Sequence, residues 1–269
     1  MSRLSILIHH ISTVRHKVKL DRATQHDLRV SSNNERIHVF LLEPLGSLNV
    51  GSVARAMSNL GFSHLHLIAP RNYHFEKAAK TACWATDVLE KIQVHDTLGE
   101  ALSEMNDVVG FTSNYGRDRI EHILLDDWIP QLNGEFQPSK IGLLFGPEDN
   151  GLQRDHIKYC RSLIRIPTVS DNPSLNLSQA VLLVLYELSK QKNALNEDAS
   201  EIQYASWSAF NKLDEYIESL GTASGFFGEA TSNAIPRLLQ GMFRRIKPTE
   251  REMNILLGLF RHIADRLRR

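Results

Sequence analysis

The chain has 269 residues, 42% of them hydrophobic, and its 31 Lys and Arg residues balance 31 Asp and Glu residues. This composition supports a sizeable core, argues against global disorder and leaves nucleic-acid binding to local basic patches, because the net charge is zero. The two cysteines, Cys83 and Cys160, form neither a disulfide framework nor a paired metal motif and fit a reducing cytoplasm, and no apolar run reaches the roughly 20 residues that span a bilayer.

Residues 1–35 show no persistent helical or strand period, and their basic residues outnumber Asp21 and Asp27. The segment ends in the polar run SSNNE, which is typical of a linker. We expect a loosely ordered extension or a start codon placed too early, and a basic arm that touches RNA is the alternative. His9 and His10 have no partners at the spacing of metal ligands, so no metal site is predicted.

An alternation of strand and helix patterns extends over residues 36–190. Strands are predicted at 36–42, 64–69, 92–94, 107–112, 141–146 and 162–166. Helices are predicted at 49–60, 76–90, 97–105, after Gly151 and at 177–190. This alternation predicts an α/β domain with a mostly parallel sheet.

A charged and polar linker is predicted over residues 191–202, and an all-helical region over residues 203–269. Three amphipathic patterns divide this region, at 203–220, 232–246 and 249–267. Glycines at 221, 225 and 228 separate the first pattern from the second. Thr249 and Glu252 have the spacing of a capping box at the start of the third.

A basic cluster surrounds the break between the last two helical patterns, and its members are Arg237, Arg244, Arg245, Lys247 and Arg251. Such a cluster is either a solvated face or a set of contacts to RNA phosphates. We expect Arg244, Arg245 and Lys247 to bind RNA, and the helical region to support a dimer.

Polar loops follow four of the predicted strands, and the carboxyl ends of strands are where open α/β sheets bind ligands. The loops cover 43–55, 111–117, 145–152 and 168–176. Glycines in the first and third loops allow close approach of a ligand to the backbone. The third loop, FGPEDNGL, can alternatively be a simple turn with an exposed carboxylate.

The first loop, EPLGSLNVGSVAR, carries Asn49 at an expected helix cap and Arg55 on the helix that follows. It lacks the GKS/T ending of a phosphate-binding loop and the G-x-G-x-x-G spacing of a dinucleotide site, so nicotinamide chemistry has little support. Taken alone, Arg55 would be read as a solvent-exposed helix arginine.

The fourth loop leads directly into a helix that is apolar at nearly every position from Leu177 to Tyr186. Asn176 or Ser178 can cap this helix, because a short side-chain oxygen accepts hydrogen bonds from first-turn amides. A helix that is apolar almost all round is expected to be buried. The stretch is either an ordinary capped core helix or a rigid base for a binding site.

Three of these segments together resemble the motifs of the SPOUT superfamily of RNA methyltransferases. They are NVGSVAR at 49–55, FGPEDNGL at 145–152, and IP at 166–167 followed by SLNLS at 174–178. The resemblance covers about residues 36–190 and implies a parallel α/β sheet with a C-terminal trefoil knot. The sequence departs from the family at Asp171-Asn172-Pro173, where relatives often carry Tyr and Ser, and this leaves the substrate detail open.

The resemblance implies S-adenosylmethionine as the cofactor, bound in the knot by Thr112, Ser113, Asn114, Gly146, Glu148, Ile166, Ser174, Leu175 and Asn176. It implies a catalytic Arg55, supported by Asn49, Glu148, Ser174 and Asn176. Because arginine stays protonated in proteins, we expect Arg55 to bind a phosphate and stabilise a developing alkoxide rather than to act as a base.

The helical C-terminal region resembles that of family members that 2′-O-methylate nucleotide 32 of the tRNA anticodon loop. The implied partners are tRNA and a second copy of the chain, since the family places its catalytic site at a two-fold interface. The same chemistry at another tRNA position or on rRNA is an alternative. A non-catalytic RNA-binding protein on a decayed methyltransferase scaffold is another.

Overall fold

The computed structural model describes residues 35–113, 121–133, 136, 138–169, 173–191, 202–227 and 234–267. The expectations for the first 34 residues and for nearly all of the linker at 191–202 lie outside the described residues. Within the described ranges, no helix is long and apolar enough to cross a membrane.

A seven-stranded sheet in the described part of the chain has the order β3-β2-β1-β6-β4-β7-β5, and every neighbouring pair is parallel. Its strands are β1 Ile37–Leu42, β2 His64–Ile68, β3 Gln93–His95, β4 Asp107–Phe111, β5 Glu121–Leu124, β6 Ile141–Phe145 and β7 Ser162–Arg165. β1, β4 and β6 are buried along their whole length, which explains why their sequences are apolar except for His38 in β1 and Asp107 in β4. The predicted α/β class with a mostly parallel sheet is confirmed.

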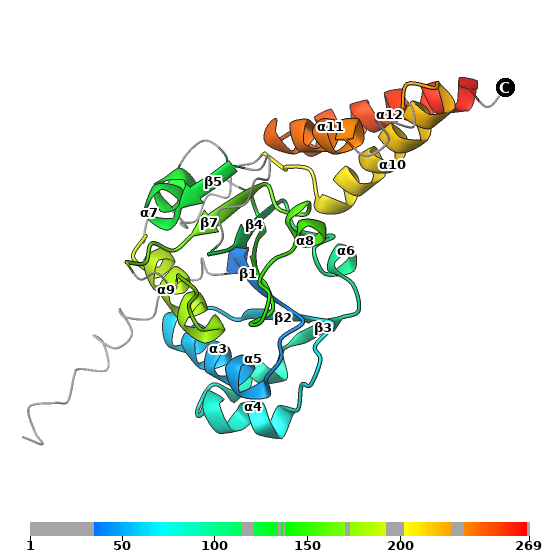
Figure 1. The fold of residues 1–269 in the computed structure, drawn as a ribbon. Coiled ribbons are helices and arrows are strands. Elements are labelled where there is room, and N and C mark those ends of the chain that lie inside the picture. The colour runs from blue at the N-terminus through cyan, green and yellow to red at the C-terminus, as the bar shows by residue number, and fades with distance from the viewer. Residues whose placement is uncertain are drawn as a thin grey trace, which may run out of the picture. The chain divides into compact units, whose positions relative to one another are not determined.

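Helices cover both faces of this sheet (Figure 1). The helices before the C-terminal region are α3 Ser47–Leu60, α4 Phe75–Ala82, α5 Thr86–Glu90, α6 Leu98–Ala101, α7 Leu125–Trp128, η2 Ile129–Asn133, α8 Arg154–Ile157 and α9 Leu177–Ser189. One core cluster contains apolar residues of α3, α4, α5 and α9, and the other contains those of α6 and α8. Alternate residues of β1 point into the two clusters, as the period of a strand requires.

Several predicted boundaries are wrong. The single helix expected at 76–90 is two helices, because Cys83 has a positive φ of 55° and ends α4. The helix expected at 97–105 is a short helix, α6, capped by Thr97. β5 and α7, which the sequence pattern did not indicate, come after β4 and before β6 along the chain.

α3 begins earlier than predicted. Its N-cap is Gly46 rather than Asn49, and Asn49 lies inside the first turn. The Ser47 hydroxyl donates to the carbonyl of Asn72 and accepts from the amide of His74, which fixes this turn against the loop after β2. The left-handed Gly61, with φ 79°, ends the helix as predicted.

The apolar helix expected at 177–190 is α9, and its cap is confirmed, since Asn176 Oδ1 accepts from the Ser178 amide at 3.0 Å. The expectation that the helix is buried all round is wrong for the single chain. One face packs into the core, while Leu182, Leu183 and Tyr186 are between 42 and 51% exposed.

The C-terminal region contains α10 Trp207–Ala223, α11 Ala234–Arg245 and α12 Glu250–Leu267. α10 continues through Gly221, so this glycine does not break it as predicted, whereas the Thr249–Glu252 capping box is present. The Trp207 amide donates to Met105 O at 2.8 Å, and Trp207 shares a core cluster with Phe40 of β1. α10 therefore completes the core on one face of the sheet.

Three histidines form a hydrogen-bonded chain across β1, β2 and β3. His38 Nδ1 lies 3.0 Å from His66 Nε2, and His66 Nδ1 lies 3.1 Å from His95 Nε2. His38 and His66 are buried. Burial, followed by positive charge on neighbouring groups, lowers the pKa of His38 to about 4 and the pKa of His66 to about 3. Both imidazoles are therefore neutral in the folded protein at neutral pH.

We expect the free energy of unfolding to fall as the pH falls below 6.5. The unfolded chain binds protons at His38 and His66 near their ordinary pKa, whereas the folded chain does so only near pH 4 and pH 3. Each of these two histidines lowers the free energy of unfolding by about 1.4 kcal/mol for each pH unit below 6.5, down to its pKa in the folded chain. Urea unfolding between pH 7 and pH 4.5 measures the slope.

The matched comparison is His66→Gln, which keeps a polar group in the chain but removes one titration. This variant should have a flatter dependence of unfolding free energy on pH than the wild-type chain. An unchanged slope would mean that other groups dominate acid unfolding.

Candidate active site

A cavity of about 320 Å³ opens where β4, β6 and β7 end. Seven of the predicted cofactor residues line it, namely Thr112, Ser113, Gly146, Glu148, Ile166, Ser174 and Leu175. They come from three loops that are far apart in the sequence and meet because parallel strands end at one edge of the sheet. Asn176 caps the adjacent helix α9, and Asn114 lies outside the described residues.

The apolar wall of the cavity includes two residues that sequence reasoning missed. Phe111 and Phe145 are the last residues of β4 and β6, and their rings stack with centroids 4.5 Å apart. Their pattern is that of ordinary core strands. The signal that could have identified them is position, since each is the first residue of a predicted binding loop.

The loop after β6 is held in a tight turn against itself. The Gly151 amide donates to Pro147 O at 2.8 Å, and Gly151 has a left-handed φ of 62°. A Cβ on Gly146 would lie 2.4 Å from the carbonyl carbon of Gly151 and 2.5 Å from the Leu152 nitrogen. Glycine at 146 is therefore required for the turn, and the turn shapes one wall of the cavity.

Glu148 joins two of the three motifs. Its Oε1 accepts from Asn49 Nδ2 at 2.9 Å, and its Oε2 accepts from the Leu45 amide at 3.0 Å. Asn176 Nδ2 lies 3.4 Å from Asn49 Oδ1, which brings the third motif to the same point. The predicted supporting residues Asn49, Glu148 and Asn176 thus form one hydrogen-bonded group beside the cavity.

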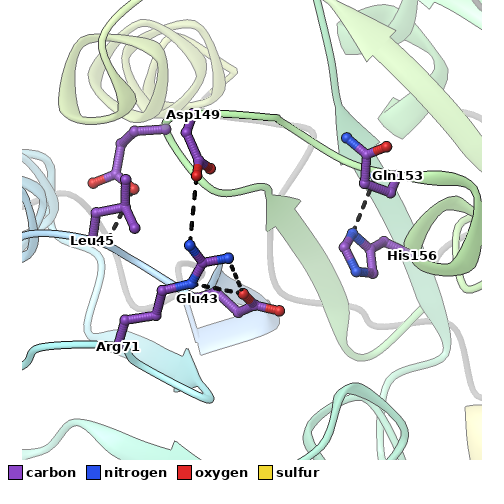
Figure 2. A network of polar contacts seen from close by, with 7 residues as sticks. Glu43, Leu45, Arg71, Asp149, Gln153 and His156 are labelled. Carbon is purple, nitrogen blue, oxygen red and sulfur yellow. Dashed lines mark hydrogen bonds and ion pairs between the residues drawn. The ribbon is translucent and has the colours of Figure 1, made fainter.

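Arg71 holds the rim of this region, and sequence reasoning did not identify it. Its guanidinium donates to Glu43 Oε2 at 2.5 and 2.9 Å and lies 3.5 Å from Asp149 Oδ2 (Figure 2). The hydrogen bond that Arg71 donates to Glu43 is the largest cause of the raised pKa of Arg71. Arg71 therefore ties the loops after β1 and β2 to a residue that lines the cavity.

Arg55 does not line the cavity in the single chain. It follows Asn49 by about 9 Å along the axis of α3. Its side chain is exposed, and its Nη1 lies 3.4 Å from the Cys83 Sγ. The structure thus brings Asn49, Glu148 and Asn176 together and leaves Arg55 on the neighbouring surface.

The predicted RNA-binding residues of the C-terminal region separate into two groups. Arg244 is 9% exposed, its Nη2 lies 2.5 Å from Asp214 Oδ2, and its guanidinium lies 4.9 Å from the Trp207 ring centroid. This corrects the prediction for Arg244, because a side chain engaged inside the helical region presents no RNA-facing group. Arg245 and Lys247 are exposed.

Within the described ranges, no three His, Cys, Asp or Glu side chains converge in a way that could hold a metal ion. A sequence profile described as the SpoU rRNA Methylase family matches residues 36–186, which contain every strand of the sheet and every loop of the cavity. The chain belongs to this family.

Individual relatives of this family are similar over most of the chain. The tRNA (cytidine/uridine-2′-O-)-methyltransferase TrmJ of Yersinia pestis is 32% identical over 238 residues, covering 84% of this chain and 91% of that protein. TrmJ of Salmonella choleraesuis is 31% identical, with coverages of 86% and 97%. The crystal structure of TrmJ from Z. mobilis ZM4 has a TM-score of 0.73 at 28% identity and covers 84% of this chain and 98% of that one.

We expect Gly146→Ala to weaken the binding of S-adenosylmethionine, the cofactor that the sequence motifs imply, by about tenfold. The added Cβ overpacks the turn against the backbone of Gly151 and Leu152, and overpacking costs about 1–3 kcal/mol. Isothermal titration calorimetry measures the affinity. Gly258→Ala is the matched control, because a Cβ there meets nothing within 4 Å, and it should leave the affinity unchanged.

Proposed function

We propose that this protein transfers the methyl group of S-adenosylmethionine to a ribose 2′-hydroxyl of tRNA, at nucleotide 32 of the anticodon loop. The observation that carries the proposal is a cavity lined by the loops of the second and third family motifs, beside which Asn49 of the first motif hydrogen-bonds to Glu148 and lies 3.4 Å from Asn176. The similarity to TrmJ over both the sheet and the C-terminal helices supports tRNA as the substrate and the cytoplasm as the location.

The residues around the cavity fit this cofactor. Its volume, about 320 Å³, lies at the lower end of the range for small-molecule and cofactor sites. Phe145 and Ile166 offer apolar surface to a purine ring, while Thr112 and Ser174 offer polar groups to its ribose and amino acid. S-adenosylmethionine supplies a methyl group already activated on its sulfonium.

The protein must therefore place the target hydroxyl in line with that methyl group and help it to lose its proton. Positioning alone can account for about 7–11 kcal/mol of the barrier. Arg55 remains protonated and exposed, so we assign it to the phosphate beside the target ribose and to the developing negative charge on the oxygen. Asn49 and Glu148 hold the start of its helix against the cavity.

We propose that the protein is a homodimer whose two copies share each site. Leu48 of α3 and Leu182, Leu183 and Tyr186 of α9 are exposed, and these two helices pack together. A two-fold contact uses the same patch on both copies, so it would cover both helices at once. It would also bring Arg55 of one copy towards the cavity of the other.

The trefoil knot is part of this proposal. β6 lies between β1 and β4, and β7 lies between β4 and β5, so the last two strands pass between earlier ones. This interleaved order supports a chain threaded in its C-terminal half, as the family resemblance implies.

The test of the function is a map of 2′-O-methylation across total tRNA and rRNA after incubation with the enzyme and S-adenosylmethionine. New methylation at nucleotide 32 supports the proposal. Methylation elsewhere in tRNA would contradict the proposed position, and methylation only in rRNA would contradict tRNA as the substrate. A chain that fails to bind S-adenosylmethionine in calorimetry would instead be an RNA-binding protein on a decayed scaffold.

We expect Arg55→Ala to lower kcat about 10²- to 10³-fold, the usual loss when one charge-stabilising donor is removed. The affinity for S-adenosylmethionine should not change, because Arg55 does not line the cavity. Single-turnover methylation and calorimetry measure the two quantities. A parallel loss of cofactor affinity would contradict the assigned role.

Mixing Arg55→Ala with Gly146→Ala tests the shared site. The assay uses S-adenosylmethionine well below saturation, so that both parent homodimers have little activity. After exchange, each mixed dimer has one site with an intact arginine and an intact cavity, so an equal mixture should regain about a quarter of wild-type activity. Mass spectrometry verifies that exchange has taken place. An exchanged mixture that stays inactive would place both groups of one site in the same copy.

The C-terminal region supplies RNA affinity in this proposal. We expect Arg245→Gln combined with Lys247→Gln to weaken tRNA binding. The slope of log affinity against log salt concentration should become less steep by up to about 1.8 for two lost phosphate contacts. Filter binding between low and moderate salt measures both. Arg261→Gln with Arg266→Gln removes the same amount of charge from α12 and should have little effect.

A further inference from the structure

One large aromatic side chain is almost wholly exposed in the described part of the chain. Trp84 is 98% exposed, whereas Trp128 and Trp207 are each 2% exposed. Tryptophan is a residue that cores and interfaces normally bury, because of its large apolar surface. An indole held in water at one defined place therefore indicates a surface that meets a partner.

The backbone around Trp84 is fixed. Trp84 lies in the break between α4 and α5, directly after Cys83 with its left-handed φ of 55°. Ala82 and Ala85 on either side are 0 and 3% exposed and anchor both ends of the break in the core. The indole thus projects from a short corner whose two ends are buried, and not from a long free loop.

The same corner is tied to the helix that carries Arg55. α4 packs so closely on α3 that a Cβ on Gly51 would lie 2.0 Å from Ala78 O. The Arg55 guanidinium reaches Cys83, the residue before Trp84, with Nη1 3.4 Å from Sγ. The proposed substrate-binding arginine therefore contacts the residue directly before Trp84, and both residues belong to the same corner, whichever copy's cavity they serve.

Charge at the corner favours an anion. Two exposed cations belong to this corner, Lys80 in the last turn of α4 and Arg55 through its contact with Cys83, and one carboxylate, Asp87, lies in the first turn of α5. Aromatic rings flanked by basic side chains are the usual means of holding unpaired RNA bases, because the ring stacks on the base while the cations bind the phosphates.

We propose that Trp84 is a stacking platform for an unpaired base next to the nucleotide whose phosphate Arg55 contacts. The inference rests on the proposed RNA methyltransferase function and adds a positioning residue to it. The occupant is a single-stranded loop base, since a base inside a duplex has no free face to stack. Its role is to orient the loop, not to act on the reacting atoms.

Tryptophan fluorescence tests the stacking directly, because acrylamide reaches Trp84 but not the two buried indoles. We expect an RNA hairpin with an anticodon-type loop to lower the acrylamide quenching constant of the exposed component at least about twofold by covering the ring. A fully paired RNA duplex of the same composition should not. Equal protection by the duplex, or none by the hairpin, overturns the proposal.

Two variants measure the consequence for the reaction. Trp84→Ala should raise the KM for the hairpin about tenfold and change kcat little, and Trp84→Phe should restore most of the loss because a phenyl ring still stacks. Phe226→Ala, which removes another exposed aromatic ring from the described residues, should leave KM unchanged. Failure of phenylalanine to rescue would overturn the stacking role.

Sedimentation of Trp84→Ala separates the inference from dimer packing. A variant that becomes monomeric would show that a second copy of the chain covers the indole, and this overturns the RNA platform. The quenching measurement does not depend on turnover. If the hairpin protects Trp84 but is not methylated, the proposed function is refuted and the stacking inference stands. Methylation by a wild-type chain whose indole stays unprotected refutes the inference alone.

Discussion

The hydrogen bonds of the Glu148 carboxylate are the contacts on which the rest of the site depends. They join Asn49 and Leu45 to a loop 99 and 103 residues further along the chain. A carboxylate with both oxygens engaged fixes the direction of the loop after β6 as well as its position. The start of α3 is thereby locked to the cavity wall, and the surface that carries Arg55 and Trp84 is held in place through α3.

The parallel sheet could be predicted because its central strands are buried on both faces and read as continuous apolar runs. The missing pieces depend on tertiary contacts. The β5 sequence, EHIL, has no pattern of its own and is a strand because it pairs with β7. The break at Cys83 is equally invisible, since the residues from Phe75 to Glu90 have ordinary helical propensities and the left-handed φ exists only in the packed chain.

The site was predicted where short polar motifs mark it and missed where its residues look ordinary. Phe111 and Phe145 read as core, and Arg71 reads as a surface arginine whose partners, Glu43 and Asp149, are distant in sequence. Arg244 is the converse case. Its charge pattern indicated an exposed contact, but the guanidinium is buried inside the helical region, where it donates to Asp214 on α10 and lies over the Trp207 ring.

The two faces of α9 explain why its sequence is apolar almost all round. The inner face buries Val181, Val184, Leu185 and Leu188 in the core, but the outer leucines remain in water in a single chain. Burying one leucine side chain contributes about 1.5–3 kcal/mol, so the exposed Leu182 and Leu183 favour the proposed homodimer, in which a second copy covers them. Because the cap of α9 hydrogen-bonds to Asn49, a second copy on that outer face would also lie against the helix of Arg55. The proposed homodimer would then account for both the apolar pattern of α9 and the distance of Arg55 from its own cavity, because the helices at its interface would also carry residues of the active site.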